Sequence, residues 1–181
     1  MGISNNTLLR TALAGLLMWS TVPTAQSLPD DRNQPIRITA DSAVRDERQG
    51  ETRYTGSVEL TQGSLQINSD TLTLRQGDGE TQIITATGSP ASLRQIPEAD
   101  SPPIEATAGK IEYDQNADTV TLSQDARIEQ DGAIVTGAVI DYVLGERRVT
   151  ASGTTETKDD QQRVEMIIPP SAIERPEKSE N

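Results

Sequence analysis

Apolar and polar residues alternate along most of this chain, beginning at residue 36. Ile36 and Ile38 flank Arg37, and further on Val58 and Leu60 flank a glutamate. The same period of two recurs in short segments at 65–67, 72–74, 120–122, 126–128 and 140–142. Alternation of this kind places one row of side chains on an apolar face and the other row in water. The pattern therefore predicts an all-β, antiparallel fold with one solvated face.

Turn signals separate the alternating segments. Asp78-Gly79 and Asp131-Gly132 predict hairpin turns, because both central positions of such a turn take a positive φ. Further bends are expected at Gln49-Gly50, Gln62-Gly63, Gly88-Ser89-Pro90 and Gly145-Glu146. The segment from Glu98 to Pro103 contains two prolines and is expected to form a loop, because proline cannot donate to a sheet ladder.

The apolar row changes parity twice within the first alternating segments. It occupies even positions up to Leu60, odd positions at Leu65 and Ile67, and even positions again from Leu72. A shift of one residue would turn the apolar row to the opposite face of the sheet. We therefore expect a bulge or a tight corner at each change of parity, which would keep the same face inward.

The chain also resembles itself at an offset of roughly 68 residues, which indicates an internal repeat. The aligned pairs are Thr39 with Thr107, Ala40 with Ala108, Tyr54 with Leu122, Val58 with Ala126, Leu60 with Ile128, Gln62 with Gln130, Ile67 with Val135, Leu72 with Ile140 and Leu74 with Tyr142. A related echo joins Ile84–Gly88 to Val149–Gly153. Stacked repeats of strands make an elongated sheet whose terminal strands keep unpaired backbone groups, and such edges pair with another copy or with a similar partner.

Composition restricts what can fill the interior. Hydrophobic residues make up 33% of the 181 residues, with three Tyr, one Trp and no Phe, so aliphatic side chains must build it. A thin, sheet-lined structure suits this composition better than a thick core. The formal net charge of −12 makes nucleic acid a poor partner, because phosphate binding depends on clustered Lys and Arg.

Two absent residue types restrict the possible chemistry. The sequence has no Cys and no His, which excludes disulfides, thiol nucleophiles, His-based triads and His-ligated metals. The acidic pairs Asp30-Asp31 and Asp159-Asp160 lack the spacing of a calcium loop and are interpreted as solvated turns. We expect no enzyme activity, no cofactor and no metal.

Residues 1–27 are interpreted as a cleaved secretory signal peptide. Arg10 supplies the positive charge, Thr11–Trp19 is a short apolar stretch, and cleavage is expected after Ser27, with Ala25 as the second choice. The alternative, an uncleaved anchor, would need about 20 apolar residues to span a bilayer. We therefore expect a soluble periplasmic protein with one domain at 28–173 and a disordered polar tail at 174–181.

A series of short motifs follows in a fixed order: Gln34-Pro35-Ile36-x-Ile38, Tyr54-Thr55-Gly56-Ser57-Val58, Thr61-Gln62-Gly63-x-Leu65-x-Ile67-Asn68-x-Asp70, Gly88-x-Pro90-Ala91 and Ile111-x-Tyr113. In order and spacing, over roughly residues 34–170, they resemble the OstA-like (LptA-type) family of periplasmic lipopolysaccharide-transport proteins. Two positions depart from the pattern. Leu93 is aliphatic where aromatics are common in the family, and Asp70 has no acidic counterpart in the second repeat, where Ala138 stands, so Asp70 is given no role.

The resemblance implies an elongated, twisted antiparallel β-jellyroll that is open at its edges and carries an apolar groove. It also implies a function, which is to shield the lipid A acyl chains of lipopolysaccharide on the way from the inner to the outer membrane. The implied partners are lipopolysaccharide, an LptC-like protein anchored in the inner membrane, the N-terminal domain of an LptD-like outer-membrane protein, and further copies joined end to end through edge strands.

The candidate ligand-binding residues are the inward apolar rows. They are Ile36, Ile38, Val58, Leu60, Leu65, Ile67, Leu72, Leu74, Leu93, Tyr113, Leu122, Ile128, Val135, Ile140 and Tyr142. Apolar contact contributes about 0.8 kcal/mol per buried CH₂, so one acyl chain would gain on the order of 10 kcal/mol gross. Lipid phosphates are expected to stay in solvent, near Arg37 at the groove mouth. The alternative is that the rows only pack on each other as a closed core.

Two other classes of function remain open on the sequence. One is an enzyme that cleaves envelope polysaccharide through a carboxylate pair, for which Glu59 and Glu129 are arbitrary choices. The other is a structural or adhesive module whose edge strands build filaments without a ligand. Within the transport system, an LptC-like protein would keep its anchor, and an LptD-like protein would continue into a large barrel.

Overall fold

The computed structural model describes residues 31–76, 82–98, 101–153 and 163–170. The predicted signal peptide, the Asp78-Gly79 turn, the Asp159-Asp160 pair and the polar tail lie outside the described residues. In the described part, one 3₁₀ turn, η1 (Asp31–Asn33), precedes ten strands. No helix of this part is long and apolar enough to cross a membrane.

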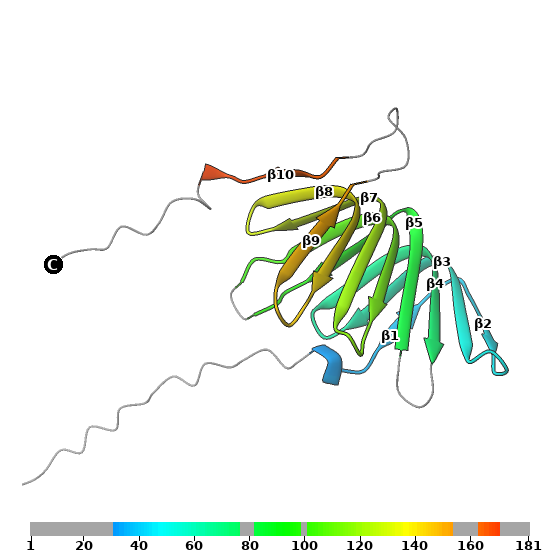
Figure 1. The fold of residues 1–181 in the computed structure, drawn as a ribbon. Helices are drawn as coiled ribbons and strands as arrows, with labels where there is room; N and C mark the ends of the chain where they lie inside the picture. Colours follow the sequence, from blue (N-terminus) through cyan, green and yellow to red (C-terminus); the bar gives the residue numbers. More distant parts are fainter. Residues whose placement is uncertain (1–30, 77–81, 99–100, 154–162, 171–181) are drawn as a thin grey trace, which may run out of the picture.

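The strands form one antiparallel sheet, which confirms the predicted fold class. They are β1 (Arg37–Thr39), β2 (Ser42–Asp46), β3 (Glu51–Gln62), β4 (Leu65–Gln76), β5 (Gln82–Gln95), β6 (Ile104–Asp114), β7 (Thr119–Gln130), β8 (Ala133–Val143), β9 (Arg148–Ser152) and β10 (Glu165–Ile167). From β3 to β8 each strand pairs with the next, β1 and β2 both pair with β3, and β9 and β10 both pair with β8. Figure 1 shows the strands side by side along one axis. The sheet is open, because its two ends do not pair with each other.

Each long strand bends at an irregularity near its middle. Register shifts lie between Thr55/Val58, Asn68/Thr71, Thr87/Ala91, Thr107/Lys110 and Ser123/Ala126. Together they form a line of corners that crosses the sheet and divides each strand into two halves. Gln115, in the turn after β6, donates to Gln62 at the end of β3 at 3.0 Å, so the far ends of opposite halves come together. The sheet is therefore folded along the corners, and its two halves face one another across the interior.

The predicted changes of parity correspond to these features. The shift between Asn68 and Thr71 is the irregularity that returns the apolar row to even positions before Leu72. The earlier change falls at the tight turn between Gln62 and Leu65, where Gly63 has a φ of 59°. At Asp131 and Gly132, φ values of 52° and 77° confirm the predicted hairpin.

The internal repeat is confirmed by the strand bounds. At the same sequence offset, the bounds of β3 correspond to those of β7, and the bounds of β4 correspond to those of β8. The register shift at Thr55/Val58 likewise corresponds to the shift at Ser123/Ala126. β1 and β2 together correspond to the single strand β6. At the other end, β9 and β10 pair with the two halves of β8 as the two halves of β5 pair with β4. The molecule is thus two repeats of about four strands, with the terminal strand broken in two at each end.

Candidate functional site: an apolar interior open at one end

The predicted site residues lie on one face and belong to one cluster. All of them are buried except Ile36, Ile38 and Leu74, which are half-buried and pack against the cluster from its N-terminal end. Between β3 and β8 the interior is filled by its own side chains, as the closed-core alternative expects. At the end formed by β1, β2 and the first half of β3, the same apolar rows reach solvent.

Several buried residues of the same interior are not among the predicted site residues. They are Ile84, Ala86, Ala91, Ile104, Ala106, Ala108, Ile111, Val120 and Ala126. Most of them could have been found from the repeat or from strict alternation: Ile111 precedes Tyr113 by two, and Val120 precedes Leu122 by two. The alanines carry too little apolar surface to stand out in a pattern of large side chains.

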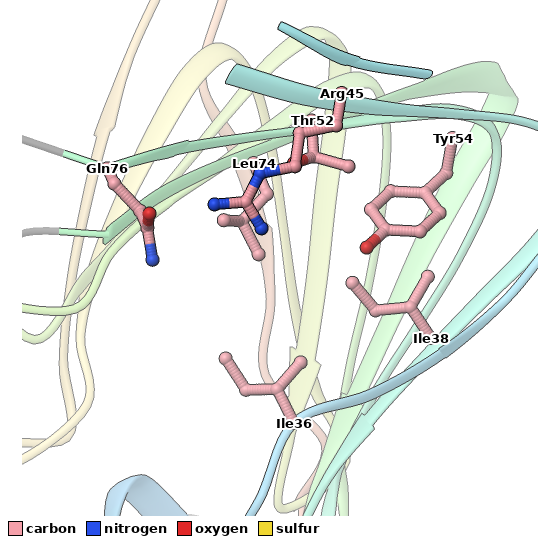
Figure 2. Close-up of a pocket in the computed structure, with 7 residues that line it drawn as sticks. All are labelled: Ile36, Ile38, Arg45, Thr52, Tyr54, Leu74 and Gln76. Carbon is pink, nitrogen blue, oxygen red and sulfur yellow. The ribbon is translucent and has the colours of Figure 1, made fainter. Parts of the chain in front are cut away.

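A pocket of about 270 Å³ lies where the interior opens, and we call it the N-terminal mouth. Its lining residues are Ile36, Ile38, Arg45, Thr52, Tyr54, Leu74 and Gln76. Figure 2 shows the apolar side chains of Ile36, Ile38 and Leu74 directed toward one hollow, with the Arg45 guanidinium extending over it. Arg37, the cation expected here, is exposed and lies between Ile36 and Ile38 at the start of β1, so it faces away from the hollow. The cation at the mouth is Arg45 instead.

The two halves of the sheet meet along a side opposite the corners, and polar contacts join them there. Beside the Gln115–Gln62 hydrogen bond, the Arg147 guanidinium lies 3.7 Å from a carboxylate oxygen of Glu98 and 3.6 Å from one of Asp131. We call these three contacts the polar seam. None of the three is a backbone ladder bond, so their loss would leave the strand pairing of the sheet intact.

The N-terminal segment is fastened to the sheet by Asp31. Its carboxylate accepts hydrogen bonds from the Ser64 amide and hydroxyl, both at 2.7 Å, and from the Gln95 side-chain amide at 3.0 Å. The interpretation of Asp30-Asp31 as a solvated turn is therefore wrong at Asp31. The contacts span more than 30 positions of sequence, which local spacing cannot reveal. They fix the segment that leads into Ile36 and Ile38.

Comparison with known proteins identifies the family. Residues 37–148 match the family described as "LptA/(LptD N-terminal domain) LPS transport protein". The chain belongs to this family.

Named relatives and a solved structure resemble the chain over most of its length. It is 36% identical to the lipopolysaccharide export system protein LptH of Pseudomonas aeruginosa over 152 residues, covering 81% of this chain and 85% of that protein. It is 28% identical to the lipopolysaccharide export system protein LptA of Escherichia coli K12, covering 94% and 90%. The crystal structure of Pseudomonas aeruginosa LptH, described as the LptA homologous periplasmic component of a lipopolysaccharide transport device, superposes with a TM-score of 0.73 at 34% identity, covering 78% of this chain and all of that one.

In this LptA-family chain, the two carboxylates considered for a polysaccharide-cleaving enzyme do not form a catalytic pair. Glu59 and Glu129 lie on β3 and β7, which are separated by three strands. At about 4.8 Å per strand they are roughly 19 Å apart along the sheet, whereas carboxylate pairs in glycosidases stand about 5–9.5 Å apart. No group of three or more acidic residues that could hold a metal occurs among the described residues.

Two pKa shifts have structural causes. Hydrogen bonds from Arg75 and then Arg53 lower the pKa of Glu51 on the exposed outer face. Burial raises the pKa of Tyr142 to about 12, and in the described part its hydroxyl has no hydrogen-bond partner. Neither group lines the N-terminal mouth.

Proposed function

We propose that this protein is a periplasmic carrier that shields the lipid A acyl chains of lipopolysaccharide during transport from the inner to the outer membrane. The observation that carries the proposal is a continuous aliphatic interior, folded between two halves of one sheet and open at the N-terminal mouth. The names of the relatives, which are lipopolysaccharide export proteins, favour the same role over an enzyme.

Entry of acyl chains would proceed by parting the two halves of the sheet along the polar seam. The interior side chains now cover one another, and an inserted acyl chain would cover them in turn, so the apolar area exposed to water changes little. Each CH₂ of the chain adds about 0.8 kcal/mol of burial. Loss of the seam costs about 0.5–1.5 kcal/mol for the hydrogen bond and at most about 1 kcal/mol for each exposed ion pair.

A photo-crosslinking experiment tests the proposal. A photoreactive residue is placed at Ile36 in the N-terminal mouth, at Leu93 in the buried interior, or at Glu59 on the exposed face as the control. Purified protein is then given lipopolysaccharide. Crosslinks from Ile36 and Leu93 but not from Glu59 are expected. If none of the three positions crosslinks in folded protein, the interior is a closed core. A structural module without a ligand then explains the protein better than a lipid carrier does.

We further propose that copies join end to end, and join LptC-like and LptD-like partners, through the broken terminal strands. At the C-terminal end, Met166, Ile167 and Ile168 are each about half exposed on or next to β10, with fractions of 58%, 53% and 48%. Exposed apolar edge strands are unusual in proteins that stay monomeric.

Charged residues on this edge should prevent assembly, since edge lysines oppose strand pairing. The double variant Met166→Lys/Ile168→Lys is compared with Glu59→Lys, which lies on β3, a strand that is paired on both sides. Light scattering at increasing protein concentration should show assembly of the wild type and of the Glu59 variant only. Equal assembly by all three proteins would mean that β10 is not the joining edge.

A further inference from the structure

The N-terminal mouth differs from the matching part of the second repeat. At the repeat offset its seven residues correspond to Ile104, Ala106, Tyr113, Val120, Leu122, Tyr142 and Leu144. Those counterparts are apolar or aromatic, and all but Leu144 are 2% exposed or less. In the mouth, by contrast, three aligned positions are polar. Arg45 aligns with Tyr113, Thr52 aligns with Val120, and Gln76 aligns with Leu144. The same architecture is therefore a dry core in one repeat and an amphipathic hollow in the other.

An end position in the sheet does not account for this difference. At the opposite end, β9 presents Val149 and Ala151 to the core cluster, and both are apolar. The polar substitutions are specific to the N-terminal end. Arg45 is a cation at the border of an apolar surface, and three neutral hydrogen-bonding side chains lie there with it. These three are Thr52, Tyr54 and Gln76.

The charge at the mouth selects for an anion. Arg45 is the one cation among the seven lining residues, and none of the seven is acidic. Its neighbour Asp46 belongs to the opposite row of β2, where it accepts hydrogen bonds from the amides of Arg48 and Gln49. Within the described residues, the Arg45 guanidinium forms no ion pair or hydrogen bond with another side chain. A guanidinium free in this way can bind a phosphate through two parallel hydrogen bonds.

We propose that the N-terminal mouth binds the phosphate-bearing head group of the transported lipid, with Arg45 on the phosphate and Ile36, Ile38 and Leu74 on the adjoining methylenes. The inference rests on the proposed carrier function and adds a polar anchor to it. The pocket's volume of about 270 Å³ is below the roughly 300–1,000 Å³ of pockets that enclose whole ligands, so it suits one phosphate and the groups next to it rather than an entire lipid. The hydroxyls of Thr52 and Tyr54 and the Gln76 amide can donate further hydrogen bonds.

The test compares diphosphorylated lipid A with the same lipid after removal of both phosphates. Binding of each to purified full-length mature protein is measured as the dissociation constant, for the wild type and for the variants Arg45→Gln, Arg45→Lys and Arg37→Gln. Arg37 is the matched control, because it is an exposed arginine on the opposite face of β1. Urea unfolding midpoints confirm that the variants are folded, and Arg45 is exposed, so its replacement leaves the fold intact.

We expect the wild type to bind the phosphorylated lipid about tenfold more tightly, which is the effect of one charge-assisted contact. Arg45→Gln should abolish this preference, Arg45→Lys should retain part of it, and Arg37→Gln should retain all of it. An unchanged preference in Arg45→Gln, or no preference in the wild type, would overturn the head-group site while leaving the carrier function standing. Failure to bind either lipid would refute the carrier function itself. Displacement of bound lipid by millimolar inorganic phosphate alone would show a site for free phosphate instead.

Discussion

Removal of the Asp31 carboxylate should destabilise the fold far more than its position near the end of the described chain suggests. The carboxylate accepts three hydrogen bonds, two from Ser64 and one from Gln95. Gln95 is buried, so removal of the carboxylate would take away the acceptor of its side-chain amide in the interior. Hydrogen bonds to charged groups contribute about 1.5–3 kcal/mol each. Since the three share one half-buried carboxylate and do not add, we expect Asp31→Ala to lower the free energy of unfolding by about 2–4 kcal/mol.

Urea denaturation followed by far-ultraviolet circular dichroism measures this change, with an unchanged m-value expected. Asp46→Ala is the control, because Asp46 accepts two backbone hydrogen bonds only within its own exposed turn. Loss of the Asp46 carboxylate should lower the free energy of unfolding by about 0.5–1 kcal/mol. Asp31→Asn should fall between the two, since Oδ1 and Oδ2 both accept and an amide can present only one oxygen. A loss for Asp31→Ala no greater than that of the control would refute the reasoning.

Three further predictions concern single residues. Because the pKa of Tyr142 is raised, its contribution to the free energy of unfolding is fully present below the ordinary pKa of 10.0 and is lost as pH rises toward about 12. Tyr142→Phe should remove this loss when the free energy of unfolding is measured from pH 9 to 12. Arg75→Gln should raise the pKa of Glu51 toward its ordinary 4.5 in an NMR titration, and an unmoved pKa would contradict the assigned hydrogen bond. Gly63→Ala should destabilise the protein by about 1–3 kcal/mol in urea, because the added Cβ would collide with Asp31, and Gly63→Ala in an Asp31→Ala background should be milder.

Local patterns sufficed for the strands and for the repeat. Alternation at Val58 and Leu60 or at Leu72 and Leu74 reports which side of a strand is apolar, and the structure places each of these residues inward. The repeat offset carried this information across the chain, since β7 occupies the positions that β3 predicts.

The role of the polar residues could not be predicted in the same way. Asp31 contacts Ser64 and Gln95 because the N-terminal segment returns to the far end of β3 and β5, and no local signal encodes that path. The prediction of Arg37 as the cation at the mouth rests on its neighbour Ile36, although alternation itself turns Arg37 outward. The repeat is the better signal, since Arg45 aligns with the buried Tyr113. A charged residue aligned with a core aromatic residue indicates that the two positions differ in function.

The arrangement of the corners and the polar seam explains how such a sheet could exchange its contents. Along the corners the two halves are covalently continuous and share ladder hydrogen bonds on both sides of each irregularity. Along the seam, the contacts named above are one hydrogen bond and the two ion pairs of Arg147, and these three together contribute at most about 3.5 kcal/mol. A single acyl chain gains on the order of 10 kcal/mol gross on burial. In the proposed carrier function this gain exceeds the contribution of these three contacts, so burial of an acyl chain would favour parting of the halves at the seam, whereas water, which gains nothing from the aliphatic rows, would not.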